Sequence, residues 1–164
     1  MRIREYGPED VPAMVELHAR TVRTMNSRHY NAEQIAAWTA PTLFQWRKSL
    51  AKSAFALVAE EGEKIIGLSD LRVPGASEDG SSVFLRRLYV DADYIGRGIG
   101  AELLEEIERR AKIIDRERIF LHSTIGAHGF YLRQRYVGDS LVRIAIQDDP
   151  NVEVDVYFME KELE

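Results

Sequence analysis

The 164-residue sequence contains no cysteine, no long apolar run and no surplus of positive charge. Without cysteine the chain can form no disulfide, no thiolate metal site and no cysteine nucleophile. No apolar stretch approaches the roughly 18 residues of a membrane-spanning helix, and the first residues do not resemble a signal peptide. The net charge of -5 argues against nucleic-acid binding, which usually needs a basic surplus. We therefore expect a cytoplasmic protein that contacts neither nucleic acid nor membrane.

The remaining composition is typical of a globular protein. Hydrophobic residues make up 45% and charged residues 30% of the chain, and its length suits one domain with a well-formed core. Internal repeats and low-complexity segments are absent, so we expect a single domain over residues 1–164. The acidic balance favours a cationic or neutral small substrate.

Hydrophobic periodicity predicts strands and helices that alternate along the chain. Strands are expected at residues 3–6, 55–60, 64–73, 83–90 and 118–122, followed by a hairpin of residues 136–147 and 152–161. Helices are expected over residues 11–25, between Asn31 and Pro41, and at residues 43–52, 99–114 and 126–135, with a polar loop at 74–82. One parallel strand–helix–strand crossover among hairpins indicates a mixed α/β sheet.

Three glycines lie between the end of a predicted strand at Val90 and the first turn of the 99–114 helix. Gly96, Gly98 and Gly100 occupy alternate positions there. Unpaired N–H groups at a helix start attract an anion, and glycine allows close approach of the backbone. The spacing is neither that of a P-loop nor the G-x-G-x-x-G dinucleotide fingerprint. By spacing alone, a phosphate site and an ordinary turn are equally good interpretations.

The wider segment resembles a known family. Residues 87–100, followed by Glu102, Leu103 and Leu104, resemble the acetyl-CoA motif Arg/Gln-x-x-Gly-x-Gly/Ala of the GCN5-related N-acetyltransferases (GNAT), in particular its small bacterial and archaeal members. Gly98 and Gly100 match, whereas Ile95 replaces Arg or Gln. Residues 123–136 resemble the pattern Asn-x-x-Ala-x-x-Φ-Tyr-x-x-x-Gly-Phe, in which Φ is apolar. The matches are Ala127, Phe130, Tyr131 and Tyr136, and the departures are Thr124 and Arg135.

The resemblance implies a fold and a cofactor site. The fold would be the α/β (α+β) acyl-CoA N-acyltransferase fold, a mixed, mainly antiparallel sheet of six to seven strands with helices on both faces. Acetyl-CoA would be the co-substrate, with its pantetheine between the strands that end at Val90 and His122. The implied contacts are Leu88, Tyr89, Val90, Ile95, Gly96, Arg97, Gly98, Ile99, Gly100 and Thr124.

The resemblance also places Tyr131 near the thioester sulfur, as a catalytic acid. A phenol can protonate a departing thiolate, although Tyr131 could instead be a core aromatic. Phe84 stands where many relatives carry a glutamate base. The remaining proton acceptors are His29, Tyr30, Glu60 or a water chain, while His122 follows a buried strand and could touch the cleft. His18 and His128 have no metal-ligand spacing, so we expect no metal.

The acceptor pocket implied by the resemblance lies at the first two helices and their connection, at His29, Tyr30 and Trp38. Core packing is an equally good interpretation of Tyr30 and Trp38. We expect an N-acetyltransferase that works by direct attack on acetyl-CoA. The alternatives are a catalytically silent acyl-CoA sensor and, against the glycine spacing, a dinucleotide-binding oxidoreductase. The acceptor could be a polyamine, amino acid, antibiotic, peptide N-terminus or protein lysine, and the protein could form a homodimer.

Overall fold

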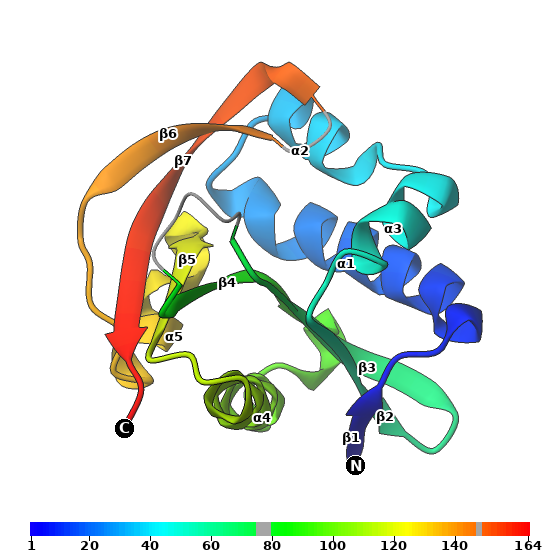
Figure 1. Cartoon of the computed structure of the whole chain (residues 1–164). Helices are drawn as coiled ribbons and strands as arrows, with labels where there is room; N and C mark the ends of the chain where they lie inside the picture. The colour runs from blue at the N-terminus through cyan, green and yellow to red at the C-terminus, as the bar shows by residue number, and fades with distance from the viewer. Residues whose placement is uncertain (75–79, 147–148) are drawn as a thin grey trace.

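A seven-stranded sheet forms the centre of the computed structural model, which describes residues 1–74, 80–146 and 149–164 (Figure 1). The spatial order is β1-β2-β3-β4-β5-β7-β6, and each neighbouring pair is antiparallel except β4 and β5. The strands are β1 (Arg2–Glu5), β2 (Phe55–Glu61), β3 (Lys64–Arg72), β4 (Ser82–Val90), β5 (Arg118–Ser123), β6 (Leu141–Ile146) and β7 (Asp149–Glu162). The predicted mixed, mainly antiparallel sheet is confirmed. Residues 75–79 of the expected polar loop and residues 147–148 of the last hairpin lie outside the described residues.

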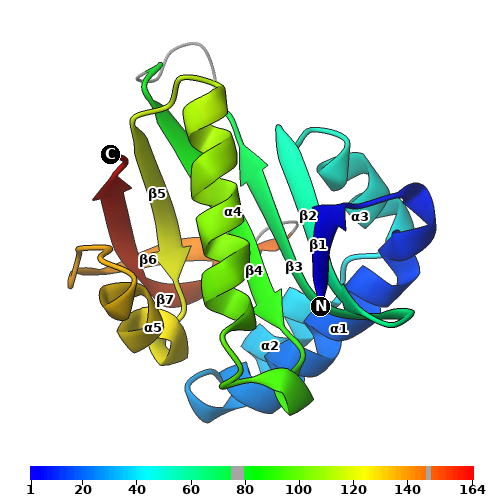
Figure 2. The ribbon, with the colours of Figure 1, turned by 90° about the horizontal axis from the view of Figure 1, so that it is seen from below.

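Helices cover both faces of this sheet, as expected. The helices α1 (Val11–Met25), α2 (Ala32–Thr39) and α3 (Leu43–Leu50) lie on one side, and α4 (Ile99–Ile113) lies on the other. Figure 2 shows α4 running across the sheet with α1 and α2 behind it. The helix expected at residues 126–135 is shorter, because a 3₁₀ turn (Ile125–Ala127) precedes α5 (His128–Arg133).

Local sequence signals explain where the helices begin. The Asn31 side chain accepts a hydrogen bond from Gln34 N, and Gln34 Oε1 accepts one from Asn31 N, both at 2.9 Å. This reciprocal cap confirms the predicted start of α2. Thr42 and Gln45 form the same arrangement at the start of α3. Pro12 lies in the first turn of α1, where its missing N–H costs no helical hydrogen bond.

The hydrophobic core has a layer on each face of the sheet. The apolar stripe of α4 is buried against β2–β5, and the stripe of α1 packs with α3 against β2 and β3. The fully buried side chains of the first layer include Leu57, Ile66, Leu103, Leu104, Ile107, Ile119 and Leu121. This double burial holds β3 and β4 at the centre of the molecule.

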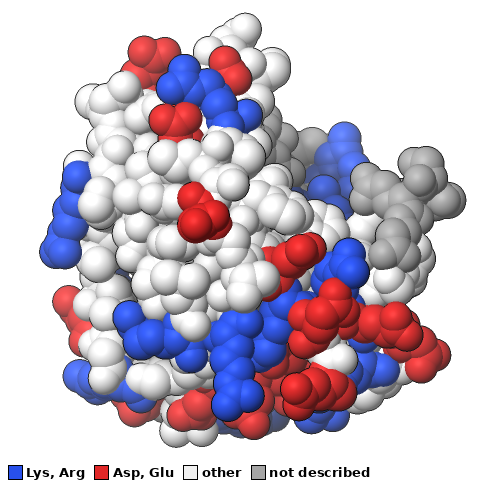
Figure 3. Space-filling model, turned by 90° about the vertical axis from the view of Figure 1, so that its left-hand side faces the viewer, with Lys and Arg blue, Asp and Glu red and all other residues white. Residues whose placement is uncertain are grey.

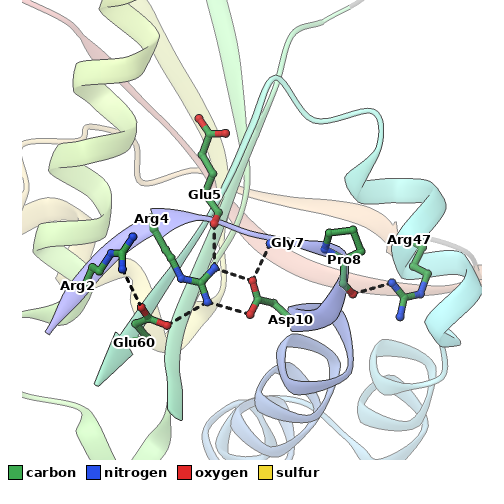
Figure 4. Close-up of polar contacts among 8 residues, drawn as sticks. All are labelled: Arg2, Arg4, Glu5, Gly7, Pro8, Asp10, Arg47 and Glu60. Carbon is green, nitrogen blue, oxygen red and sulfur yellow. Dashed lines mark hydrogen bonds and ion pairs between the residues drawn. The ribbon is translucent and has the colours of Figure 1, made fainter. Parts of the chain in front are cut away.

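A polar network joins the N-terminal strand to the rest of the sheet (Figure 4). Arg4 donates to Asp10 Oδ2 at 2.8 Å and to Glu60 Oε2 at 3.0 Å, and Asp10 also accepts the Gly7 N–H. The Arg4 hydrogen bonds hold the pKa of both carboxyl groups below their usual values. The Glu60 carboxylate is therefore held in an ion pair with Arg4 of β1.

On the face shown in Figure 3, charged side chains of both signs lie at the top and toward the bottom, and a largely uncharged area lies between them. Leu141 and Val137 are among the exposed apolar side chains of the protein, at 53% and 62%. Among the described residues, no helix has the length and apolar character needed to cross a membrane.

Candidate active site

The two parallel strands at the centre of the sheet separate before β4 ends. Pairing between β4 and β5 runs from Ser82 and Arg118 to Leu85 and Leu121, whereas β4 remains paired with β3 as far as Val90. In the β3–β4 ladder Leu71 pairs with Leu85 and Asp70 with Arg87, so that Arg86 is an extra residue in β4. Such a bulge bends a strand and increases its twist. A gap therefore opens between β4 and β5.

A cavity of about 600 Å³ lies where the strands part. Its wall is formed by the ends of β4 and β5, the glycine turn, the end of α1 and α5. Twelve of the residues singled out from the sequence line this cavity: His29, Tyr30, Leu88, Tyr89, Val90, Ile95, Gly96, Gly98, Ile99, Gly100, Thr124 and Tyr131. Two others do not. Arg97 stacks over the Tyr94 ring with its guanidinium carbon 4.7 Å from the ring centre, and Trp38 lines a smaller cavity next to the first.

The glycine turn exposes backbone to the cavity. Gly96 and Gly98 have φ of +85° and +83°, which L side chains rarely adopt, and a Cβ at either position would have nothing within 4 Å. Because α4 begins at Ile99 and Gly98 offers no capping side chain, the first-turn N–H groups lack intrahelical acceptors. These features fit a bound pyrophosphate. Gly100 has a different role, since a Cβ there would lie 3.3 Å from the Phe130 ring.

Asp91 fixes the start of the turn that leads from β4 to the glycines, and its role was not predicted from the sequence. Its buried carboxylate accepts the Asp93 N–H at 2.9 Å and pairs with Arg20 and, at 3.4 Å, with Lys64. Although burial opposes ionisation, the Asp93 N–H and the two cations keep the pKa of Asp91 below its usual value. The signal was an aspartate directly after a strand, where it can cap the following turn.

Tyr131 is 93% buried and reaches the cavity from α5, next to the rings of Phe130 and Tyr136. Burial, together with the nearby Tyr89, raises the pKa of the Tyr131 phenol above its ordinary value. The phenol therefore stays protonated at neutral pH and can donate a proton or a hydrogen bond. Arg135, where the family pattern has glycine, adopts φ of +70°, the region that glycine enters at least cost.

The proton acceptors considered from the sequence differ in their placement. Glu60 is not a lining residue and is ion-paired with Arg4 at 3.0 Å. The Tyr30 hydroxyl donates to Asp155 O at 2.7 Å and accepts the Ile125 N–H at 3.1 Å, so this residue fastens β7 to the loop after β5. Burial raises the pKa of Tyr30. His29 is exposed and lies at the rim, where a Cβ at Gly126 would be 3.3 Å from its ring.

His122 also lines the cavity. Its ring centre lies 5.5 Å from that of Phe84 and 6.1 Å from that of Phe158. Burial lowers the pKa of this imidazole, so that it is neutral at pH 7 and can accept a proton. Phe84 itself stacks on Phe120, with ring centres 5.1 Å apart. The position considered for a glutamate base therefore belongs to an aromatic cluster on the sheet.

Other lining residues had no distinctive signal in the sequence, and they include Thr21, Arg86, Arg133 and Gln134. Thr21 donates to Val90 O at 3.1 Å and so joins α1 to the end of β4. Tertiary folding alone brings these side chains together. In the part of the chain that the structure describes, no three His, Cys, Asp or Glu side chains are grouped so that they could hold a metal ion.

Comparisons with known proteins agree with this architecture. The sequence model of the Acetyltransferase (GNAT) family matches residues 16–136. A curated relative, the uncharacterized N-acetyltransferase YafP of Escherichia coli K12, is 26% identical over 107 residues, which span 65% of this chain and 65% of that protein.

Solved structures of the same fold include a GCN5-related N-acetyltransferase from Rhodopseudomonas palustris, with a TM-score of 0.85, 21% identity and coverage of 99% of this chain and 95% of that one. The PaiA N-acetyltransferase of Thermoplasma acidophilum, solved with coenzyme A, has a TM-score of 0.73 and 20% identity over 98% of each chain. With the family match over most of its length and this fold, the chain belongs to the GNAT acetyltransferase family.

Proposed function

We propose that this protein transfers the acetyl group of acetyl-CoA directly to a primary amine. The observation that carries the proposal is the cavity of about 600 Å³, which is lined by the glycine turn, by the part of β4 that β5 leaves unpaired, and by Tyr131. Membership of the GNAT family supports the use of an acyl-CoA.

The cofactor would lie along the edge of β4 that β5 leaves unpaired beyond Leu85. Its pyrophosphate would bind at residues 95–100, where the N–H groups at the start of α4 favour an anion. Its pantetheine arm would bond to the backbone of Leu88, Tyr89 and Val90, which β5 leaves without a partner on that side beyond Leu85. Thr124 would contact the arm from the opposite wall, and Arg97 would add positive charge from the solvent side.

Two residues would handle protons during the transfer. The neutral amine attacks the thioester carbonyl, the C–N bond forms and the C–S bond breaks. We assign His122 as the acceptor of the proton that the amine nitrogen loses, because its imidazole is neutral and lines the cavity. We assign Tyr131 as the donor of a proton to the leaving thiolate. The products are then an N-acetylated amine and CoA with a free thiol.

Direct attack agrees with the composition, since a chain without cysteine has no thiol for a cysteine acyl intermediate. One observation favours a second candidate, a sensor that binds acetyl-CoA without turnover. Phe84 is stacked on Phe120 and leaves no carboxylate at the position where many relatives carry one. The glycine spacing argues against a dinucleotide-binding oxidoreductase.

A screen for thiol release from acetyl-CoA tests the proposal. The purified protein is incubated with acetyl-CoA and a panel of amino acids, peptides, polyamines and aminoglycosides, and free thiol is measured over time. We expect release that depends on the acceptor and falls in the Tyr131→Phe variant. Stabilisation by acetyl-CoA without release for any amine would identify the sensor instead.

A further inference from the structure

The large cavity is lined from both faces of the sheet. On one face α4 begins there, at the glycine turn, and on the other face α1 ends there, at Met25 and the following residue Asn26 (Figure 2). Thr21, one helical turn before Met25, donates to Val90 O at 3.1 Å and holds this end of α1 against the end of β4. The pyrophosphate of the proposed cofactor would lie at the glycine turn, so the wall at the end of α1 is left for the acceptor.

Asn26 forms part of this wall and is only 7% exposed. Its backbone is fully hydrogen-bonded, because its N–H donates to Val22 O and its carbonyl oxygen accepts the N–H groups of His29 and Tyr30, both at 3.0 Å. Its side chain differs. The Nδ2 atom is buried and has no hydrogen-bond partner among the described residues.

A buried amide N–H without a partner lowers the stability of a protein, and most buried polar groups are hydrogen-bonded. Asn31 shows the usual arrangement, since its side chain accepts the Gln34 N–H and caps α2. The Nδ2 atom of Asn26 makes no comparable contact within the part of the chain that the structure describes. An oxygen atom of a ligand in the cavity would supply the missing acceptor and remove the cost.

The Asn26 amide can turn toward such a ligand. Its Nδ2 atom is not held by a hydrogen bond to any described residue, and the terminal torsion of an asparagine side chain is broad. An amide N–H needs an oxygen as its acceptor. The C-terminal end of a helix also carries partial negative charge, which favours an amine that arrives as an ammonium ion. This wall therefore suits a molecule with both an amino group and an oxygen atom.

We propose that the acceptor is an amine that also carries a hydroxyl or carbonyl oxygen, and that the side-chain amide of Asn26 binds this oxygen. The inference rests on the proposed function for the role of the amine. Asn26 then determines specificity and takes no part in proton transfer. Amino alcohols, amino sugars and peptide N-termini carry such an oxygen. Aliphatic polyamines carry none and would leave the amide without a partner.

Calorimetric titration of the protein saturated with CoA tests the inference without turnover, because CoA has no acetyl group to transfer. The titrants form two matched pairs, 2-aminoethanol against propylamine and 4-aminobutan-1-ol against pentylamine. The members of a pair differ only by a hydroxyl group in place of a methyl group, and all four are protonated at pH 7. We expect the amino alcohol of at least one pair to bind at least tenfold more tightly than its alkylamine.

Variants assign this preference to Asn26. Asn26→Leu removes the amide and keeps a side chain of similar size, so it should abolish the preference while the stability to denaturant stays equal or rises. Asn26→Ala repeats the test with a side chain that cannot clash. Asn31→Leu is the matched control, since it removes the cap of α2 and should lower stability while the preference persists.

Three results would each overturn the inference. The first is equal binding within both pairs, or no binding of any of the four compounds. The second is a preference that persists in folded Asn26→Leu or Asn26→Ala. The third is a loss of stability in both Asn26 variants as large as that in Asn31→Leu, because the amide would then support the fold.

The screen for thiol release separates this result from the proposed function. Tighter binding of the amino alcohols without thiol release from acetyl-CoA would contradict the transferase and leave the role of Asn26 standing. Thiol release with propylamine and pentylamine as fast as with their amino alcohols would support the transferase and overturn the role of Asn26.

Discussion

Leu85 of β4 and Leu121 of β5 form the last residue pair of the parallel ladder, although β4 continues to Val90. The apolar side chains of both residues are buried against α4. The core thus holds the two strands together up to this pair, and the bulge at Arg86 separates them beyond it.

Acetyl-CoA should stabilise the folded chain, and NAD and FAD should not. At one hundred times its dissociation constant a ligand adds about 2.7 kcal/mol to the free energy of unfolding. For a chain of this size that corresponds to a rise in Tm of roughly 5–10 °C. Differential scanning fluorimetry with the three ligands checks this. A rise with NAD and none with acetyl-CoA would reverse the assignment.

Gly98→Glu should abolish binding of acetyl-CoA in a protein that still folds. The new carboxylate would lie where the pyrophosphate should bind, and the positive φ should cost about 1–2 kcal/mol of stability. Gly62→Glu is the matched control, because Gly62 also has a positive φ, +63°, with nothing within 4 Å of its Cβ. Both variants should lose similar stability, measured by denaturant unfolding, but only Gly98→Glu should lose affinity by calorimetry. Equal affinities would make Gly98 a plain turn residue.

Tyr131→Phe should lower turnover by ~10²–10⁴ and leave the affinity for acetyl-CoA within a few-fold of the parent. The substitution removes the proton and keeps most of the ring packing. Because burial raises the pKa of Tyr131, loss of activity through its ionisation should begin only above the ordinary range of a phenol. Steady-state kinetics on an established acceptor measure the effect. Undiminished turnover would leave Tyr131 as a packing residue.

His122→Asn should reduce turnover and remove the acidic limb of the pH profile. Burial lowers the pKa of His122, so the neutral base should persist below the usual histidine range, and activity should fall as the pH drops through the lowered value. His128→Asn is the control, since His128 stacks on Tyr157 and bonds to Gly138 O. If both variants keep the parental acidic limb, His122 is not the proton acceptor.

His18 should make the fold sensitive to acid. In the unfolded chain its pKa is near 6.5 and in the folded protein about 3, because burial and the charge of Arg87 disfavour the imidazolium. Its contribution is complete above pH 6.5 and is lost at about 1.4 kcal/mol per pH unit as the pH falls toward 3. Denaturant unfolding at pH 7.0 and 4.5 should show a smaller fall in His18→Gln than in the parent. An equal fall would refute this.

Local patterns in the sequence were sufficient for most of the secondary structure and for the glycine turn. The start of α2 at its Asn31 cap, the amphipathic helix α4 and the glycine turn before it depend on interactions between residues close in the sequence, and the two helices formed where they were predicted. The family resemblance added the sheet and its helices on both faces, which the structure and the comparisons confirm. The roles of Tyr131 and the cofactor contacts stay predictions.

Tertiary structure alone decided the chemistry of the cavities. The bulge at Arg86 arises where two strands pair out of register, and Trp38 lies in the small cavity because α2 packs near β6 and β7. Neither the bulge nor the position of Trp38 can be read from the residues next to it in the sequence. The net charge of -5 is a sum over the whole chain, whereas the charge at a site depends on the few side chains that the fold brings together. Among the described residues that line the two cavities, the Asp, Glu, Lys and Arg side chains present are all arginines, and the sum over the chain does not show this.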